Sequence, residues 1–431
     1  MTRTTKMATA RAAALLAVLL AAAAAGATDD PALHTRYGDP AVTLSAEIDA
    51  LGGTGAAVYR GGFSNVINPA CLALGEGWRL DASGMLAQAH EDRFVPLWDS
   101  FGSYVTDTAI ASNRHHRFGA GFAAAGRLPI AWRPVTAALS LTERYAFDYD
   151  FTETIRDPDS FSSPRDAVLQ DRGVEIGGAL RALSGGAGVA LTDRLALGLA
   201  AHYAYGTRDQ VRRVQDYDVA ANTFREDSEH AMRGLYFTLG ARMRVDDRLA
   251  LALAYDSPLT AAGDTHVETT LGAYPDSVQL VPGRATVDYP RVYRLGLSYQ
   301  PRTTPRTVFT VDAAYAEWSD LSDTRLPNSV LAQDTWDVLA GLEHRFYNDT
   351  VARFGFRRLD SYDDGEAGAS FFTGGVGFPA AGGSLDVSVS LSKFTSERGH
   401  WFAYPAEFTA APVSRVEDMR FGLGVGFSRA F

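Results

Sequence analysis

Alternation of apolar and polar residues is the feature that most constrains what this chain can fold into. Between residues 235 and 245 the apolar positions are Leu235, Phe237, Leu239, Ala241, Met243 and Val245, with Thr238, Gly240, Arg242 and Arg244 among the residues between them. A period of two indicates an extended strand whose successive side chains point to opposite faces. The pattern recurs in segments 195–205, 249–255, 293–299, 336–343, 385–391 and 419–431. The chain is therefore predicted to consist of strands with one apolar face.

The residues opposite the apolar set decide between a soluble sheet and a membrane barrel. Both would alternate, but an exposed soluble face is dominated by Lys, Glu and Thr, whereas here glycine is mixed with Asp and Arg. Such a set suits a polar lumen, where opposite charges can pair. After residue 27 no apolar run is long enough for a membrane-spanning helix. We therefore expect an all-β fold, a transmembrane antiparallel β-barrel.

The connections between strands are predicted to alternate in length. Short ones fall near residues 128–132, 192–194, 246–248, 301–305, 347–350 and 379–383. Longer polar stretches lie near residues 91–115, 157–171, 215–230, 256–283, 317–334, 360–369 and 396–416. Outer-membrane barrels have short periplasmic turns and long external loops, and bacterial ones have an even number of strands. Counting between these breaks predicts about 14 strands.

The amino terminus has the pattern of a secretory signal peptide, predicted to span residues 1–27. Arg3, Lys6 and Arg11 supply positive charge, residues 12–25 are apolar, and Ala25-Gly26-Ala27 is a small-residue cleavage site. The alternative, a membrane anchor, is disfavoured because the apolar stretch is short and rich in alanine. The expected location is the bacterial outer membrane, as a multi-pass protein exported through a cleaved signal peptide.

Composition excludes several classes of function. Cys71 is the single cysteine, so the chain forms no internal disulfide and no cysteine-based metal or redox site. The formal net charge of −11 and the scattered arginines argue against nucleic acid as a partner. The His115-His116 pair has no third ligand at a suitable spacing, so no metal is expected. Residues 360–366 carry an acidic cluster that could bind calcium, but a solvated loop is the favoured interpretation.

Residues 28–77 do not alternate and are predicted to form a small plug, or hatch, inside the lumen. Residues 41–51 resemble a short helix, and the glycines that follow, from Gly52 to Gly62, indicate a flexible run. The barrel is then expected to occupy residues 78–431.

The residues of this segment resemble a known family. The run GGTGAAVYRGGFSNVINPACLAL resembles the hatch of the FadL/OmpP1/TodX outer-membrane transporters, with Asn68-Pro69-Ala70 at the family's Asn-Pro-Ala signature. Segments 249–260, 293–320 and 336–346 are similar to later strands of that family, including Tyr315, Trp318 and Ser319. The resemblance implies a barrel of fourteen strands blocked by an amino-terminal hatch.

The resemblance also implies a function. It predicts passive uptake of hydrophobic compounds, such as long-chain fatty acids or aromatic hydrocarbons, without cofactor or enzymatic activity. The expected partners are hydrophobic small molecules, outer-membrane lipid and lipopolysaccharide, and the barrel-assembly machinery. Two alternatives stay open: a barrel enzyme, for which no motif is found, and a docking or shuttle component of a secretion system.

Candidate site residues follow from the same positions. Asn65, Asn68, Pro69 and Ala70 are expected to form the hatch or gate. Substrate contacts are predicted at Phe63, Val66 and Ile67 in the hatch and at Trp401, Phe402 and Tyr404 in an external segment. The alternatives are a small hatch core for the first three residues and an interfacial aromatic girdle for the others.

Two further groups complete the expectations. Lumenal charges could bind a substrate carboxylate, but pairing with one another or with the hatch is the favoured interpretation; they are Arg242, Arg244, Arg294, Asp312, Glu343, Arg345, Arg353 and Arg357. The terminal strand, with Phe427 and Phe431 on its apolar face, resembles the assembly signal of outer-membrane barrels.

Overall fold

The structure is a computed structural model of the 431-residue chain. It describes residues 33–41, 44–98, 101, 103–130, 133–157, 167–272, 274–326, 331–363, 366, 368–402 and 413–431. The expected signal peptide, residues 1–27, lies outside the described residues. Among the described residues no helix has the length and apolar character needed to cross a membrane.

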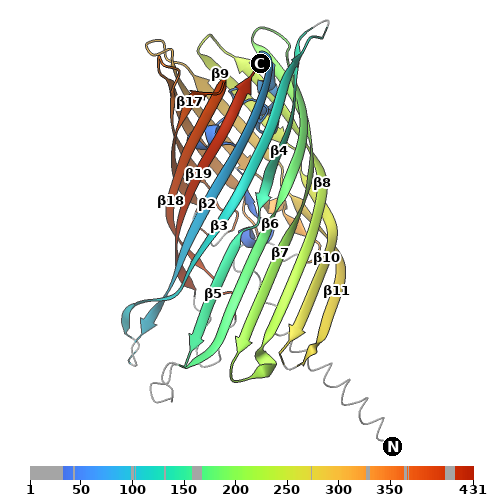
Figure 1. Cartoon of the computed structure of the whole chain (residues 1–431), viewed down its shortest axis with the longest axis vertical. Coiled ribbons are helices and arrows are strands. Elements are labelled where there is room, and N and C mark those ends of the chain that lie inside the picture. Colours follow the sequence, from blue (N-terminus) through green and yellow to red (C-terminus); the bar gives the residue numbers. More distant parts are fainter. Residues whose placement is uncertain are drawn as a thin grey trace, which may run out of the picture.

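A single antiparallel sheet closes on itself to form a barrel (Figure 1). Closure is made by β19 (Ser414–Ala430) and β2 (Trp78–Trp98), which pair from Arg415 with Phe94 to Ala430 with Arg79. Closure leaves no exposed sheet edge at this seam, as a strand in lipid requires. The sheet thus joins the last strand of the chain to the first long one.

Fourteen strands side by side make up the wall over the described residues. Four of these strands are interrupted, so that each consists of two segments. The interrupted strands are β4 with β5, β9 with β10, β11 with β12, and β13 with β14. The remaining strand bounds are β3 Tyr104–Leu128, β4 Val135–Ala146, β5 Tyr149–Arg156, β6 Val168–Ala190, β7 Leu195–Asp216, β8 Phe224–Arg244, β9 Leu249–Asp256, β10 Leu259–Leu271, β11 Tyr274–Tyr289, β12 Val292–Tyr299, β13 Thr307–Ala316, β14 Ser322–Asp323, β15 Thr335–Arg345, β16 Val351–Leu359, β17 Ala369–Ala380 and β18 Gly383–Arg398. The predicted fold class is confirmed.

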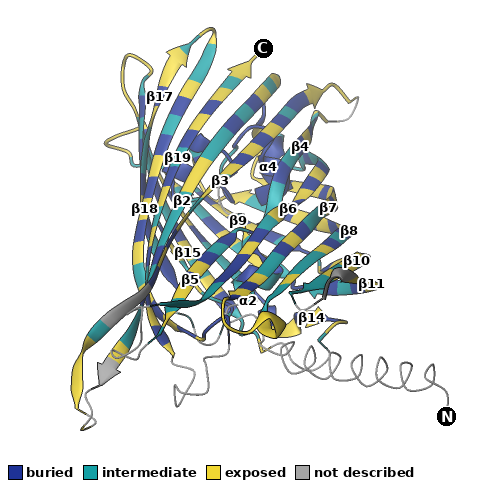
Figure 2. Ribbon diagram, turned by 60° about the horizontal axis from the view of Figure 1, so that its bottom comes forward, coloured by how far each residue is buried: buried dark blue, intermediate teal, exposed yellow. Residues whose placement is uncertain are grey.

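The alternation in sequence corresponds to two faces of the wall (Figure 2). Along β7, for example, Leu199 and Tyr203 are exposed on the outside, whereas Ala200 and His202 are buried inside. In an aqueous solvent such an apolar exterior would be an aggregation surface, so it is the face that meets lipid.

Three of the predicted outer loops are wrong, because strands run through them. Residues 256–283 belong largely to β10 and β11. Residues 91–98 belong to β2 and residues 104–115 to β3, and the two strands stay paired as far as the rung of Trp98 and Tyr104. Residues 215–230 include the ends of β7 and β8 and the short η2 helix (Ala220–Asn222). Polar residues on both faces hid the strand signal, because outside the membrane neither face has to be apolar.

The segment before β2 lies inside the barrel, and we call described residues 33–41 and 44–77 the hatch. It contains α2 (Leu33–Tyr37), the two-residue strand β1 (Asp39–Pro40), α3 (Ala46–Ala50), α4 (Ser64–Ile67) and the 3₁₀-helix η1 (Pro69–Leu74). Helix α3 contacts β16, β17, β18 and β19, and η1 contacts β4, β6, β7 and β8. Because these strands stand on different sides of the lumen, the hatch lies across it.

Two of the hatch helices, α3 and η1, begin with a side-chain cap. The Ser45 side chain accepts a hydrogen bond from the Ile48 amide at the beginning of α3. The Asn68 side chain accepts one from the Ala70 amide, and Pro69 occupies the first turn of η1, where its missing N–H costs nothing.

Glycines in the wall let the hatch backbone pack directly against it. A methyl group on Gly198 of β7 would lie 2.2 Å from the Pro69 carbonyl carbon, and one on Gly240 of β8 would lie 2.1 Å from Asn68 Oδ1. The inward glycines therefore create room for η1 rather than flexibility.

We predict that Gly198→Ala loosens the hatch. The added methyl group must displace Pro69, which we expect to lower the free energy of unfolding by about 1–3 kcal/mol. Urea unfolding of the detergent-solubilised protein measures this change. Gly185→Ala is the matched control, because a methyl group there faces outward with Leu139 Cδ2 at 3.4 Å. Equal unfolding midpoints for the two variants would contradict the packing argument.

Candidate functional site

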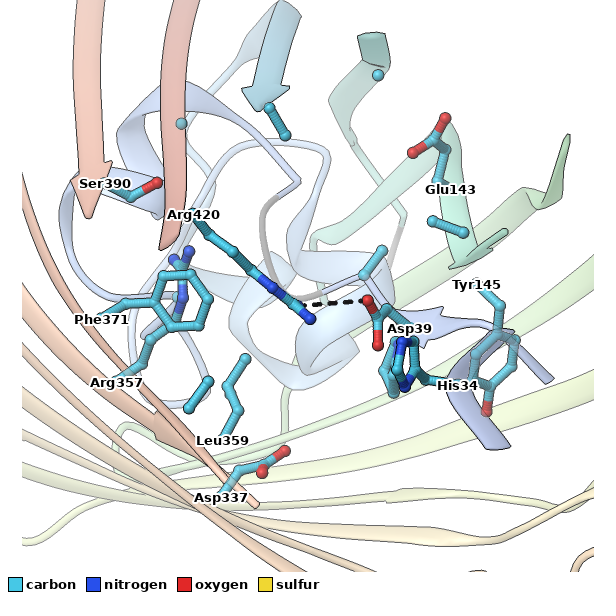
Figure 3. A pocket seen from close by; sticks show the side chains of 18 of the residues that line it. His34, Asp39, Glu143, Tyr145, Asp337, Arg357, Leu359, Phe371, Ser390 and Arg420 are labelled. Atoms are coloured by element: carbon cyan, nitrogen blue, oxygen red, sulfur yellow. Dashed lines mark hydrogen bonds and ion pairs between the residues drawn. The ribbon is translucent and has the colours of Figure 1, made fainter. Parts of the chain in front are cut away.

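A cavity of about 380 Å³ lies between the hatch and the barrel wall (Figure 3). Its apolar lining comes from both parts: Leu44, Val66 and Ile67 of the hatch, and Met85, Leu339, Leu359 and Phe371 of the wall. Aromatic residues at its outer side, Tyr145, Trp318 and Tyr362, belong to a buried lumenal cluster in which Trp318 stacks on Tyr362 with ring centroids 3.9 Å apart. An apolar molecule could be enclosed here with little exposure to water.

The cavity reaches a place where two neighbouring strands of the wall are not paired. Strands β3 and β4 pair only from Phe122 with Leu141 to Leu128 with Val135. Beyond Leu141, the edge of β4 pairs instead with the hatch strand β1, through Asp39 with Ala146 and Pro40 with Tyr145. We call this region, between residues 113–121 of β3 and residues 142–151 of β4 and β5, the wall gap.

The cavity extends to the wall gap, where it lies close to the lipid-facing surface. Gly119, Ala120 and Glu143 line the cavity, while Phe118, the neighbour of Gly119 on β3, is 70% exposed on the outer face. An Arg117–Glu143 ion pair bridges the two unpaired strands, and His115 Nε2 lies 3.8 Å from Asp148 Oδ2. Side chains, rather than a backbone ladder, therefore close the wall at this point.

A β-bulge and a glycine kink produce the gap. The register of β4 on β6 shifts between Glu143 and Tyr145, and such an extra residue re-aims the side chains that follow it. The strand is then interrupted between β4 and β5, where the Phe147 amide donates to the carbonyl of Gly178. Gly178 has a φ of 112°, a backbone conformation that side-chain-bearing residues rarely adopt.

Ion pairs hold the hatch in the lumen. Asp49 Oδ1 lies 2.9 Å from Arg357 Nη1, and Asp49 Oδ2 accepts a hydrogen bond from Ser388. Glu47 Oε2 lies 2.9 Å from Arg79 Nη2, and its other oxygen lies 2.9 Å from Arg60 of the hatch. Burial opposes ionisation of Glu47, but the surrounding arginines outweigh it and hold the pKa of this carboxyl well below its usual range.

The predicted gate residues are buried between the hatch and the wall. Asn68 Nδ2 donates to the Ala56 carbonyl at 2.7 Å and to the Ala241 carbonyl of β8 at 3.3 Å. Asn65 donates to the carbonyl of Ser184 and accepts from Ser140. Pro69 and Ala70 lie against the wall glycines, as described above. These contacts anchor the hatch, whereas a gating role stays a prediction.

The predicted substrate contacts occupy two different places. Val66 and Ile67 line the cavity, while Phe63 is buried in the small hatch core. Trp401 and Phe402 are buried in the lumenal aromatic cluster, where Trp401 packs on Tyr149 at 5.4 Å between centroids. Tyr404 lies outside the described residues. Substrate contact by any of them stays a prediction.

The remaining predicted positions can also be placed. Phe427 and Phe431 are exposed on the outer face of β19 and at its end, and their role in assembly stays a prediction. Of the lumenal charges, Asp312 accepts from the Gly55 and Ala56 amides, and Arg242 donates to the Ala57 carbonyl. The other contacts are Arg294 with Asp256, Glu343 with Arg60 and Arg353, and Arg357 with Asp49, while Arg244 and Arg345 are exposed.

Sequence reasoning missed Arg420, Asp39 and His34, which Figure 3 shows together at the cavity. Arg420 Nη1 lies 3.5 Å from Asp39 Oδ2. His34 Nδ1 lies 3.4 Å from Oε2 of Glu366, which belongs to the acidic cluster at residues 360–366. Burial lowers the pKa of His34, but the Glu366 carboxylate outweighs it, so the pKa is raised. Only Arg420 carried a signal, its inward place in the last strand; the other two lie in a segment without periodicity.

Comparisons with known proteins agree on the architecture. No family model matches the chain, and no curated protein matches it. Among solved structures, a Pseudomonas aeruginosa FadL homologue aligns with a TM-score of 0.65 and 14% identity, covering 91% of this chain and 100% of its own. The P. putida toluene transporter TodX gives 0.62 and 15%, with 89% and 97% covered, and the Ralstonia pickettii toluene transporter TbuX gives 0.59 and 17%, with 90% and 98%.

The chain has the fold of these three proteins. The architecture that the hatch resemblance implied is therefore confirmed over about nine-tenths of the chain. At such low identity the likeness extends to the fold alone, so the function has to be argued from the cavity and the wall gap.

Cys71 offers a test of how firmly the hatch is seated. Its thiol is buried and donates to the Ala56 carbonyl, and burial raises the pKa of Cys71 to about 12. Relative to an ordinary thiol this lowers the thiolate fraction at pH 8 about a thousandfold. We expect maleimide to leave Cys71 unlabelled in the native protein and to label it fully after denaturation, as measured by mass spectrometry.

The control is a Cys71→Ala variant that carries Asp247→Cys in an exposed turn, which should be labelled in both states. Rapid labelling of Cys71 in the native protein would show that the hatch does not hold this residue in the packed position.

Proposed function

We propose that this protein is an outer-membrane channel for the passive uptake of hydrophobic compounds, such as long-chain fatty acids or aromatic hydrocarbons. It uses no cofactor and performs no covalent chemistry. Residues 1–27 are removed as a signal peptide, residues 28–77 form the hatch, and residues 78–431 form the barrel in the bacterial outer membrane. Two proteins of the same fold are toluene transporters by name, which supports this assignment.

One observation carries the proposal: the apolar cavity extends to the wall gap. A hydrophobic solute gains free energy by leaving water for lipid, about 25 cal/mol per Å² of apolar surface. A lateral exit at the wall gap delivers it to the bilayer without passage through periplasmic water. A barrel that served only to dock secretion partners would need neither an apolar cavity nor a lateral opening, so these features favour uptake.

The hatch residues take defined parts in this route. Asn65, Asn68, Pro69 and Ala70 anchor the inner part of the hatch to the wall, and β1 covers the free edge of β4. Movement of β1 away from Tyr145 and Ala146 would widen the wall gap while the anchored part continues to block the lumen. Val66 and Ile67 contact the solute in the cavity, and Phe63 supports them; Trp401 and Phe402 line the approach from outside.

We predict that Gly119→Leu abolishes most uptake without unfolding the protein. A Cβ atom at position 119 would lie 3.1 Å from Glu143 Oε2, so the larger side chain fills the wall gap. Uptake of radiolabelled toluene and oleate by cells that express the variant should fall to roughly a tenth of the wild-type rate, about 1.4 kcal/mol in barrier height. Heat-modifiable migration in gels checks that the barrel is folded.

Gly185→Leu, on the outer face of β6, is the matched control and should leave uptake unchanged. Normal uptake by a folded Gly119→Leu barrel would exclude the wall gap as the exit. If wild-type cells take up neither compound faster than cells without the protein, the proposed function itself is wrong.

A further inference from the structure

One row of inward side chains in the cavity carries opposite charges that do not meet. Arg294 of β12 is the rung partner of Ala314 on β13, and Ala314 is the rung partner of Asp337 on β15. All three residues line the cavity. Adjacent strands are about 4.8 Å apart, so the backbones of Arg294 and Asp337 are separated by about 10 Å, with only a methyl group between them. Within the described chain no ion pair joins these two residues.

Each end of the row has hydrogen-bonding capacity left over. Arg294 Nη2 binds Asp256 at 2.8 Å, whereas the buried Nη1 has no partner. One oxygen of Asp337 accepts from the Asp360 amide at 2.9 Å, and in Figure 3 the carboxylate points into the cavity beside Leu359. Asp312, two residues before Ala314 on the same face, has a buried Oδ1 atom without a partner. Unsatisfied buried polar atoms of this kind are rare and call for a partner.

The guanidinium is held in place from behind. Asp256 is buried, binds Arg144 at 3.2 Å as well as Arg294, and accepts a hydrogen bond from Thr238 Oγ1 at 2.7 Å. Thr238 is hydrogen-bonded in turn to His202. Because this network fixes Arg294, the arginine does not swing across Ala314 to Asp337, and the space above Ala314 stays open to a ligand.

We propose that Arg294, Ala314 and Asp337 form a slot for the hydroxyl group of an otherwise apolar compound, such as an alkylphenol or an alcohol. A hydroxyl oxygen accepts from a guanidinium N–H, and the same hydroxyl hydrogen is donated to a carboxylate. An alkane or an arene satisfies neither end, and a carboxylate would be repelled by Asp337. The slot rests on the proposed uptake function and names, within it, the polar group that the cavity selects.

Two probes that differ by one hydroxyl group test the slot: p-cresol and toluene. Equilibrium dialysis of each radiolabelled compound against the full-length protein in mild detergent gives its affinity, after subtraction of partition into protein-free micelles. Hydrogen bonds to charged groups are the stronger class, so we expect p-cresol to bind about tenfold more tightly than toluene. Asp337→Leu should abolish this preference and leave toluene binding within about twofold.

A second pair of variants guards against misfolding. Ala314→Leu covers the floor of the slot and should also abolish the preference, whereas Val311→Leu, at an exposed residue on the outward face of β13 that does not line the cavity, should keep it. Equal affinities of the wild type for the two probes, or a preference that survives both Asp337→Leu and Ala314→Leu, would overturn the slot and leave the uptake function standing. Binding of neither probe would instead count against the uptake function and the slot together.

Discussion

The structure depends on one constraint: a strand that crosses a bilayer must have every backbone N–H and C=O paired, because lipid offers no hydrogen-bond partner. Closure of β19 on β2 meets this constraint at the seam. The ladder between β3 and β4 does not meet it beyond Phe122 and Leu141. Unpaired backbone at membrane depth is costly, which makes the wall gap a feature that the rest of the fold has to compensate.

The compensation comes from the hatch. Strand β1 supplies the backbone partners that β3 leaves open on β4, and the Ala41 amide extends this pairing to the Arg144 carbonyl. The hatch in turn is held by ion pairs such as Asp49 with Arg357, and by close backbone contact with Gly198 and Gly240. Hatch and wall therefore form one interdependent unit, in which the segment that lies in the lumen also pairs with the open edge of β4.

Alternation in the sequence was sufficient to predict the wall, because lipid forces every second residue to be apolar along β7, β8 and β19. Beyond the membrane this force is absent, and the long β2–β3 hairpin was predicted as a loop. The wall gap was also beyond prediction. It depends on a one-residue bulge near Arg144 and on the positive φ of Gly178, which change no residue type in the pattern.

Prediction of the site succeeded where residues stand in a pattern and failed where they stand alone. Arg294, Asp312 and Arg357 alternate with outward residues, so their inward position followed from the period. Their partners did not follow, since Asp256 ends a different strand and Asp49 belongs to the hatch. Trp401 and Phe402 follow β18 without periodicity, and only the three-dimensional structure places them in the lumenal cluster.

The charges in the cavity then have to be reconciled with an apolar solute. Most are neutralised locally, as Arg117 is by Glu143 and Arg144 by Asp256, so the solute meets paired groups rather than free ions. A paired arginine still has N–H groups that its carboxylate does not use, and in a low-dielectric space such groups attract any acceptor that the solute carries. An apolar cavity lined by incompletely satisfied ion pairs therefore selects for the few polar atoms of its ligand, while the apolar body supplies the affinity.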